Sequence, residues 1–100
     1  MRRIARVDRN QAEIVAALRA AGATVQPLHA VGQGCPDLLV GFRGFNLLVE
    51  VKDGAKALSR RSLTDRQTAW HGGWKGTVAV VEDAPAALAV LGLIGTGGAD

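Results

Sequence analysis

The pattern of hydrophobic positions along the chain first predicts an amphipathic helix over residues 10–21. Apolar side chains recur there three and four positions apart, so they share one face of a helix, and Gly22 follows as a stop signal. A short strand is predicted over residues 24–28. The glycine and proline residues between positions 30 and 36 predict a loop.

Two continuous apolar runs predict the centre of the fold. They cover residues 38–42 and 45–51 and are separated by only two residues, one of which is glycine. This is the pattern of two strands joined by a tight turn. Pairing the strands about that turn places Asp37 opposite Glu50.

The second half of the chain predicts a helix, a strand and a last helix, over residues 65–74, 77–82 and 86–94. Thr64 stands at the N-cap position of the first of these helices. Gln67, three residues later, completes the sequence pattern of a capping box. The resulting order, α-β-β-β-α-β-α, predicts an α/β fold in which helices flank a mixed β-sheet.

The length of 100 residues predicts one domain, because so short a chain has no room for a second core. We expect the core to span about residues 8–94, with a flexible basic arm over residues 1–7 and a flexible tail over residues 95–100. Hydrophobic residues make up 48% of the chain and charged residues 21%, which is typical of a globular protein. No apolar run is long enough to cross a membrane, so we expect no membrane partner. A single cysteine, Cys35, cannot form an internal disulfide, and we expect a cytoplasmic protein, either bacterial or phage-encoded.

The net charge of +3 is concentrated in two segments. Residues 1–9 carry four arginines and one aspartate, and residues 52–66 carry five basic and two acidic residues, so each segment has a charge of +3. Two basic segments on a nearly neutral body favour a polyanionic partner, of which nucleic acid is the commonest. The alternative is two solvated segments without a partner.

The predicted hairpin brings together side chains that suit phosphodiester hydrolysis. Strand alternation places Glu50 and Lys52 on one face, and the hairpin brings Asp37 to the same end of the sheet. Two carboxylates can bind Mg²⁺, which activates water and stabilises charge on a phosphate, while a lysine can neutralise the developing oxyanion. The alternative is an exposed aspartate beside a Glu–Lys surface pair, because such spacings are common by chance.

Two motifs around these residues resemble the active-site signature of the PD-(D/E)xK nuclease superfamily. They are residues 34–41 (GCPDLLVG) and residues 48–54 (LVEVKDG). Residues 63–67 (LTDRQ), with the Trp-His and Trp-Lys-Gly groups that follow, are similar to the VRR-NUC (virus-type replication-repair nuclease) group within that superfamily. The resemblance extends from about residue 8 to residue 90.

This resemblance implies a restriction-endonuclease-like fold and a Mg²⁺- or Mn²⁺-dependent DNA endonuclease. It also implies branched or Holliday-junction-like DNA as the substrate and a homodimer as the active form. The implied catalytic residues are Asp37, Glu50, Lys52 and Gln67. The implied metal ligands are Asp37, Glu50, the Val51 carbonyl and, through a water, Glu13. Cys35 departs from the small or polar residue typical of this loop, and we interpret it as a packed residue rather than a nucleophile.

The basic segments supply the residues expected to contact DNA. Arg60 and Arg61 follow the catalytic motif closely, so they are placed to reach phosphates. The full set of expected DNA contacts is Arg60, Arg61, Lys56, Arg66 and Arg6.

Gln67 has two possible roles. It can cap its helix through the Thr64 backbone, or it can point into the active site. On the expectation that one rotamer cannot serve both, we favour the active site.

Two other pairs of residues also leave alternatives open. His29 and His71 can serve as general bases, but we favour structural roles for both, with His71 as a cation at a helix end. Trp70 and Trp74 have the spacing of a core or subunit contact rather than of base stacking.

The sequence therefore favours a metal-dependent, structure-selective DNA endonuclease. A chain of this length leaves little room for a separate sequence-reading domain, which favours recognition of DNA shape. Two cuts by a small subunit favour a homodimer. The alternatives are a non-catalytic nucleic-acid-binding module on the same fold and an interaction protein whose tryptophans form a partner surface.

Overall fold

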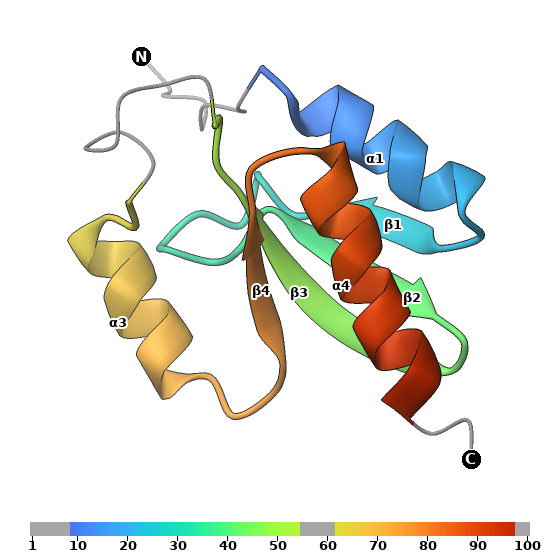
Figure 1. Cartoon of the computed structure of the whole chain (residues 1–100). Helices are drawn as coiled ribbons and strands as arrows, with labels where there is room; N and C mark the ends of the chain where they lie inside the picture. The colour runs from blue at the N-terminus through green and yellow to red at the C-terminus, as the bar shows by residue number, and fades with distance from the viewer. Residues whose placement is uncertain (1–8, 55–61, 98–100) are drawn as a thin grey trace.

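A computed structural model describes residues 9–54 and 62–97 (Figure 1). Its elements in chain order are α1 (Gln11–Ala20), β1 (Thr24–Pro27), β2 (Leu38–Phe42), β3 (Phe45–Val51), α3 (Asp65–Gly73), β4 (Val78–Val81) and α4 (Ala84–Gly97). The predicted mixed α/β architecture is confirmed. Among the described residues, no helix has the length and apolar character needed to span a membrane.

The four strands form one sheet in the order β1-β2-β3-β4. The first three strands are antiparallel neighbours, whereas β4 pairs parallel to β3 after the crossover through α3. The predicted hairpin is confirmed: Phe42 faces Phe45 and Leu38 faces Val49. Arg43 and Gly44 both have positive φ, the geometry of a tight two-residue turn that matches the strand twist. The register places Asp37, immediately before β2, beside Glu50.

Helices α1 and α4 cover one face of the sheet and enclose an aliphatic core (Figure 1). Alternate residues of β2 and β3 point into this core, as strand periodicity requires. Its buried members are Ile14, Leu18, Ala23, Leu38, Val40, Leu47, Val49, Val51, Val81, Ala87 and Leu91. The core therefore packs one face of the sheet against α1 and α4 and leaves the other face to α3.

The opposite face of the sheet is only partly covered, by α3. None of the residues of α3 is buried. On the sheet beneath, Leu39 remains 39% exposed and Val80 remains 47% exposed. The intervening residues of β3 on this face are Leu48 and Glu50, so the predicted catalytic acid lies between the sheet and α3.

The last helix is longer than the sequence pattern predicted. It begins at Ala84. The preceding residue, Asp83, caps it, because its carboxylate accepts a 2.8 Å hydrogen bond from the Ala86 N–H. It continues to Gly97, so the first part of the expected flexible tail is helical. A glycine ends a helix when its backbone adopts a left-handed conformation, as Gly22 does after α1 with φ 101°. The glycines within α4 do not end that helix, which continues to Gly97.

Candidate active site

The hairpin of β2 and β3 brings the predicted acids together at one end of the sheet. Asp37 Oδ2 accepts a hydrogen bond of 2.7 Å from the Val51 backbone N–H, which anchors this carboxylate to the end of β3. Glu50 lies on the neighbouring position of β3 and is 2% exposed. Lys52 is the first residue after β3, and its Nζ lies 3.6 Å from Glu50 Oε2. The predicted convergence of two carboxylates and one ammonium is therefore present.

Gln67 joins these groups from α3. Its Oε1 accepts a 2.7 Å hydrogen bond from Lys52 Nζ, and its Nε2 donates a 2.9 Å hydrogen bond to Glu50 Oε2. The amide thus links Glu50 on β3 to Lys52, the first residue after that strand. The residue also connects the sheet to a helix that is otherwise not buried.

The same Gln67 side chain caps α3. Its Oε1 also accepts a 3.0 Å bond from the Thr64 N–H, while the Gln67 N–H donates to Thr64 Oγ1 at 3.2 Å. The expectation that one rotamer cannot serve both roles is wrong. An amide oxygen has two acceptor lone pairs, so Oε1 receives the helix N–H and the ammonium together, while the amide nitrogen points to the carboxylate.

Glu50 is electrostatically unfavourable as an anion in this setting. The pKa of its carboxyl is raised to about 8, first by burial and then by the nearby Asp37 carboxylate, while Lys52 acts in the opposite direction. One oxygen, Oε2, is held by Gln67, whereas Oε1 is buried without a hydrogen-bond partner among the described residues. A cation at Oε1 would relieve both the desolvation and the repulsion from Asp37.

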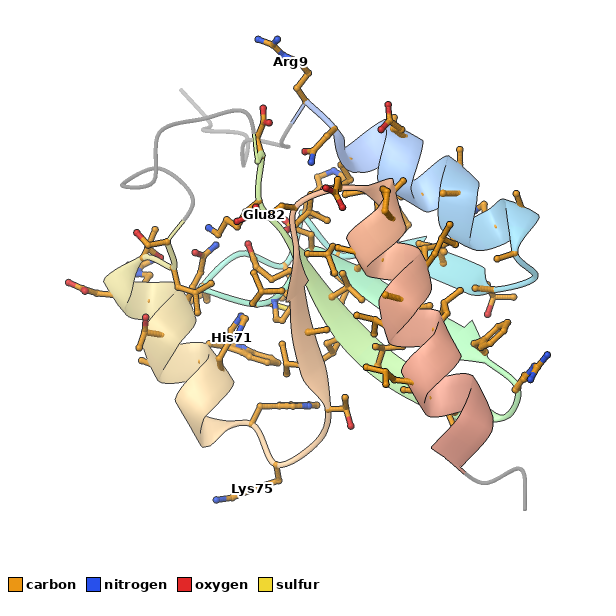
Figure 2. The ribbon with its side chains drawn as sticks, in the orientation of Figure 1. Arg9, His71, Lys75 and Glu82 are labelled. Atoms are coloured by element: carbon orange, nitrogen blue, oxygen red, sulfur yellow. The ribbon has the colours of Figure 1, made fainter. Side chains whose placement is uncertain are left out.

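His71 also faces this carboxylate, from the next turn of α3. Its Nε2 lies 3.9 Å from Glu50 Oε1 and is buried with no hydrogen-bond partner in the described part of the chain. Figure 2 shows the imidazole pointing from α3 toward the sheet. Burial and the charge of Lys52 lower the pKa of His71, against an opposing effect of Asp37. The imidazole is therefore favoured in its neutral form and does not act as a cation at the helix end.

The sequence contained a signal for His71 that the helix-end interpretation missed. His71 follows Gln67 by four residues, and residues four apart share one face of a helix. Once Gln67 points at the site, His71 must face the same way.

The start of α1 is tied to the site end of the sheet by Asn10, which the sequence analysis did not single out. Asn10 Nδ2 donates to the Lys52 carbonyl at 3.1 Å and to the Glu82 carbonyl at 2.7 Å. It thereby holds the ends of two parallel strands together. Glu13, the expected outer metal ligand, is exposed on α1 and makes no hydrogen bond or ion pair with another described residue.

The loop before β2 packs closely on the first turn of α3. Gly34 has φ 86°, and a Cβ at this position would lie 2.5 Å from the Arg66 carbonyl oxygen. Only glycine permits this approach. The next residue, Cys35, has its pKa raised by burial and by the Asp37 and Glu50 carboxylates, so its thiol stays protonated. This agrees with its interpretation as a packed residue rather than a nucleophile.

Whether the site suits a metal ion depends on its donors. No group of three or more His, Cys, Asp or Glu side chains within the described ranges could hold a metal. Mg²⁺, however, is commonly bound by one or two carboxylates and keeps several waters. The buried Glu50 Oε1, which has no hydrogen-bond partner within residues 9–54 and 62–97, lies near the second carboxylate of Asp37 and suits such a cation. The donor set fits Mg²⁺ or Mn²⁺.

Of the residues expected to contact DNA, the structure describes only Arg66. It is exposed on the first turn of α3 and lines a cavity of about 180 Å³ together with Asp37, Gln67 and His29. Arg6, Lys56, Arg60 and Arg61 lie outside the described residues.

Trp70 and Trp74 are not among the residues of the buried hydrophobic core. Their rings stack with centroids 4.7 Å apart and planes inclined by 18°, and Trp74 is 48% exposed. Both line a second, mostly apolar cavity between α3 and the sheet. A core role is therefore wrong for Trp74, because α3 does not close onto the sheet here.

Comparisons with known proteins identify no relative of this chain. A scan against protein-family models, a search of curated proteins and a search of solved structures each found no match. The arrangement of the side chains is thus the basis for any functional conclusion.

Proposed function

We propose that this protein is a Mg²⁺- or Mn²⁺-dependent DNA endonuclease with a restriction-endonuclease-like fold. One observation carries the proposal: the buried Glu50 Oε1 has no hydrogen-bond partner among the described residues and its carboxyl faces the charge of Asp37, while Gln67 holds Lys52 next to the same carboxyl group. An acidic pair next to an ammonium combines cation binding with stabilisation of negative charge, the two requirements of phosphodiester hydrolysis.

The ligands proposed for the metal are the Asp37 and Glu50 carboxylates and the Val51 carbonyl, with Glu13 acting through a water. A bound Mg²⁺ or Mn²⁺ would supply Lewis-acid stabilisation of the phosphate oxygens and activation of the hydrolytic water. Asp37 is already oriented by the Val51 N–H, and Glu50 by the Gln67 amide. Because these two hydrogen bonds already orient the carboxylates, less conformational entropy is lost when the carboxylates bind a cation.

Lys52 provides the positive charge at the reacting phosphate. Its ammonium has three donors and gives one to Gln67 Oε1. The remaining donors can bind a phosphate oxygen as negative charge develops in the transition state. Gln67 sets the direction of this ammonium and so acts as a positioning residue as well as a neighbour of the reacting atoms.

The substrate we propose is branched or Holliday-junction-like DNA, cut by a homodimer in the cytoplasm. The two basic segments support a nucleic-acid partner, because they can neutralise backbone phosphates. A junction needs two cuts, which two copies of one small domain can supply with twofold symmetry.

The test compares cleavage of linear duplex, single-stranded, flap and four-way junction DNA with and without Mg²⁺ or Mn²⁺. We expect metal-dependent cutting, strongest on the branched forms, and its loss in Glu50→Gln and Asp37→Asn. Asp65→Asn is the matched control, because Asp65 is an exposed acid in the first turn of α3. Cutting that persists in excess chelator would contradict the metal site. DNA binding without cutting under any metal would indicate the non-catalytic binding module instead.

A further inference from the structure

A mostly apolar cavity of about 450 Å³ lies between α3 and the partly covered face of the sheet. Leu39, Leu48, Trp70 and Trp74 form its apolar walls, and Asn46 and Thr77 contribute polar groups. Its size falls within the range of about 300–1,000 Å³ that is common for small-molecule sites. The proposed catalysis at Glu50 makes no use of this space.

The apolar cavity adjoins the catalytic groups. Cys35 lines both this cavity and the polar cavity that contains Asp37 and Gln67. Trp70 belongs to the same helix as Gln67 and His71, between the two in sequence. On β3, Leu48 precedes Glu50 by two residues and therefore shares its face. A group covalently attached to a phosphate at the acids can therefore reach the cavity.

The tryptophans give this cavity a flat aromatic wall. The Trp70 and Trp74 rings are stacked, which fixes their orientation, and Trp74 keeps nearly half of its surface exposed. Such a preorganised indole can stack on another planar ring at little entropic cost. A nucleobase is the planar part of a nucleic acid, and Asn46 and Thr77 can hydrogen-bond to its edge.

We propose that this cavity binds one unpaired nucleobase of the DNA strand whose phosphate lies at the Asp37–Glu50 site. This inference rests on the proposed function, because that function supplies the DNA. A base within a paired duplex is held in the stack, and only a base already unpaired or extruded can enter the cavity. The cavity thus selects junctions, bulges and single strands over intact duplex. It would let this domain select DNA by the presence of an unpaired base rather than by sequence.

The test uses the intrinsic fluorescence of the protein. The sequence contains two tryptophans and no tyrosine, so the emission comes from Trp70 and Trp74 alone. Three hairpin duplexes are titrated into the metal-free protein: one fully paired, one with a single-nucleotide bulge and one with an abasic bulge. We expect the bulged base to quench the emission and to bind most tightly, while the paired and abasic duplexes cause little quenching.

Variants locate the effect in the cavity. Trp74→Ala should weaken binding of the bulged base roughly 5- to 150-fold, the range for stacking on one aromatic ring, and leave binding of the abasic bulge unchanged. Trp74→Phe keeps a ring and should retain most of the affinity, which separates stacking from folding. Equal affinity and equal quenching for the base and abasic bulges would overturn the proposal.

The two proposals fail in different ways. Metal-dependent cleavage without discrimination between base and abasic bulges would leave the nuclease standing and refute the base-binding cavity. Base-specific quenching without cleavage under any metal would refute the nuclease and leave the base-binding cavity standing. Emission that changes with protein concentration alone, and not with DNA, would also overturn the cavity proposal, by assigning this face to a second copy of the chain.

Discussion

Replacement of Gln67 by alanine is the sharpest test of the site, because this one amide joins the helix cap to Lys52 and Glu50, two of the proposed catalytic residues. The change removes a bond to the Thr64 N–H and bonds to Lys52 Nζ and Glu50 Oε2. The cap bond and the bond to Glu50, whose carboxyl keeps its proton below about pH 8, contribute about 0.5–1.5 kcal/mol each, and the bond to the Lys52 ammonium contributes about 1.5–3 kcal/mol. Lys52 and Glu50 lie 3.6 Å apart and can close on each other, which recovers part of the loss. We expect Gln67→Ala to cost about 2–4 kcal/mol of unfolding free energy.

Thr64→Ala is the matched control for the cap alone. It removes the hydroxyl that accepts from the Gln67 N–H but leaves the Lys52–Gln67–Glu50 bridge intact, and should cost about 1 kcal/mol. Gln67→Glu is the second control. A carboxylate at this position can still accept from the Thr64 N–H and from Lys52, but it cannot donate to Glu50.

The two measurements are urea denaturation of the metal-free protein and single-turnover cleavage per folded molecule. We expect the cleavage rate to fall at least tenfold in Gln67→Ala and Gln67→Glu and to stay near that of the unaltered protein in Thr64→Ala. If Gln67→Ala costs no more stability than Thr64→Ala and leaves the rate per folded molecule unchanged, the bridge has no role. Gln67 is then a helix cap alone.

Three further predictions concern the loop, the acids and the DNA contact. Gly34→Ala should lower stability and cleavage more than Gly32→Ala, because both residues have positive φ but only the Gly34 Cβ would collide with Arg66; denaturation and cleavage assays measure the difference. Between pH 6.5 and 8, the unfolding free energy of the metal-free protein should fall by about 1–2 kcal/mol through Glu50, and the fall should be absent in Glu50→Gln; denaturation at a series of pH values measures it. Arg66→Ala should reduce the salt dependence of DNA binding by about one unit of slope, as measured by titrations at several salt concentrations.

The sign of the pH effect follows from the raised pKa of Glu50. In the folded protein this carboxyl keeps its proton up to about pH 8, whereas in the unfolded chain it releases the proton near its ordinary value of 4.5. Its contribution to stability is therefore complete below pH 4.5 and is lost as the pH rises through 8. His71, with its lowered pKa, acts in the opposite direction as the pH falls below 6.5, so the window above 6.5 isolates Glu50.

Each of these three predictions has an outcome that contradicts it. Equal losses in the two glycine variants would show that left-handed backbone strain, and not the contact with α3, decides the effect. A flat pH profile in the unaltered protein would show that Glu50 ionises normally in the folded state. An unchanged salt slope would show that Arg66 does not touch the DNA backbone.

The sequence by itself determined the hairpin and the acids it carries. Strand periodicity and a two-residue turn set the register, and that register alone places Asp37 beside Glu50 and directs Lys52 to the same face. The capping box was equally visible, because its two residues lie three apart on one helix turn. These are local relations, which depend on neighbours in the sequence or on one short turn.

Tertiary structure alone decided what faces these acids from across the sheet. The parallel pairing of β3 with β4 carries α3 over the face that bears Glu50, so that Gln67 bridges two charged groups and His71 meets the carboxylate. The raised pKa of Glu50 and the open cavity beside the tryptophans have the same origin. Helix periodicity shows which residues of α3 share a face, but the direction of that face depends on contacts between residues fifteen or more positions apart, which no local pattern records.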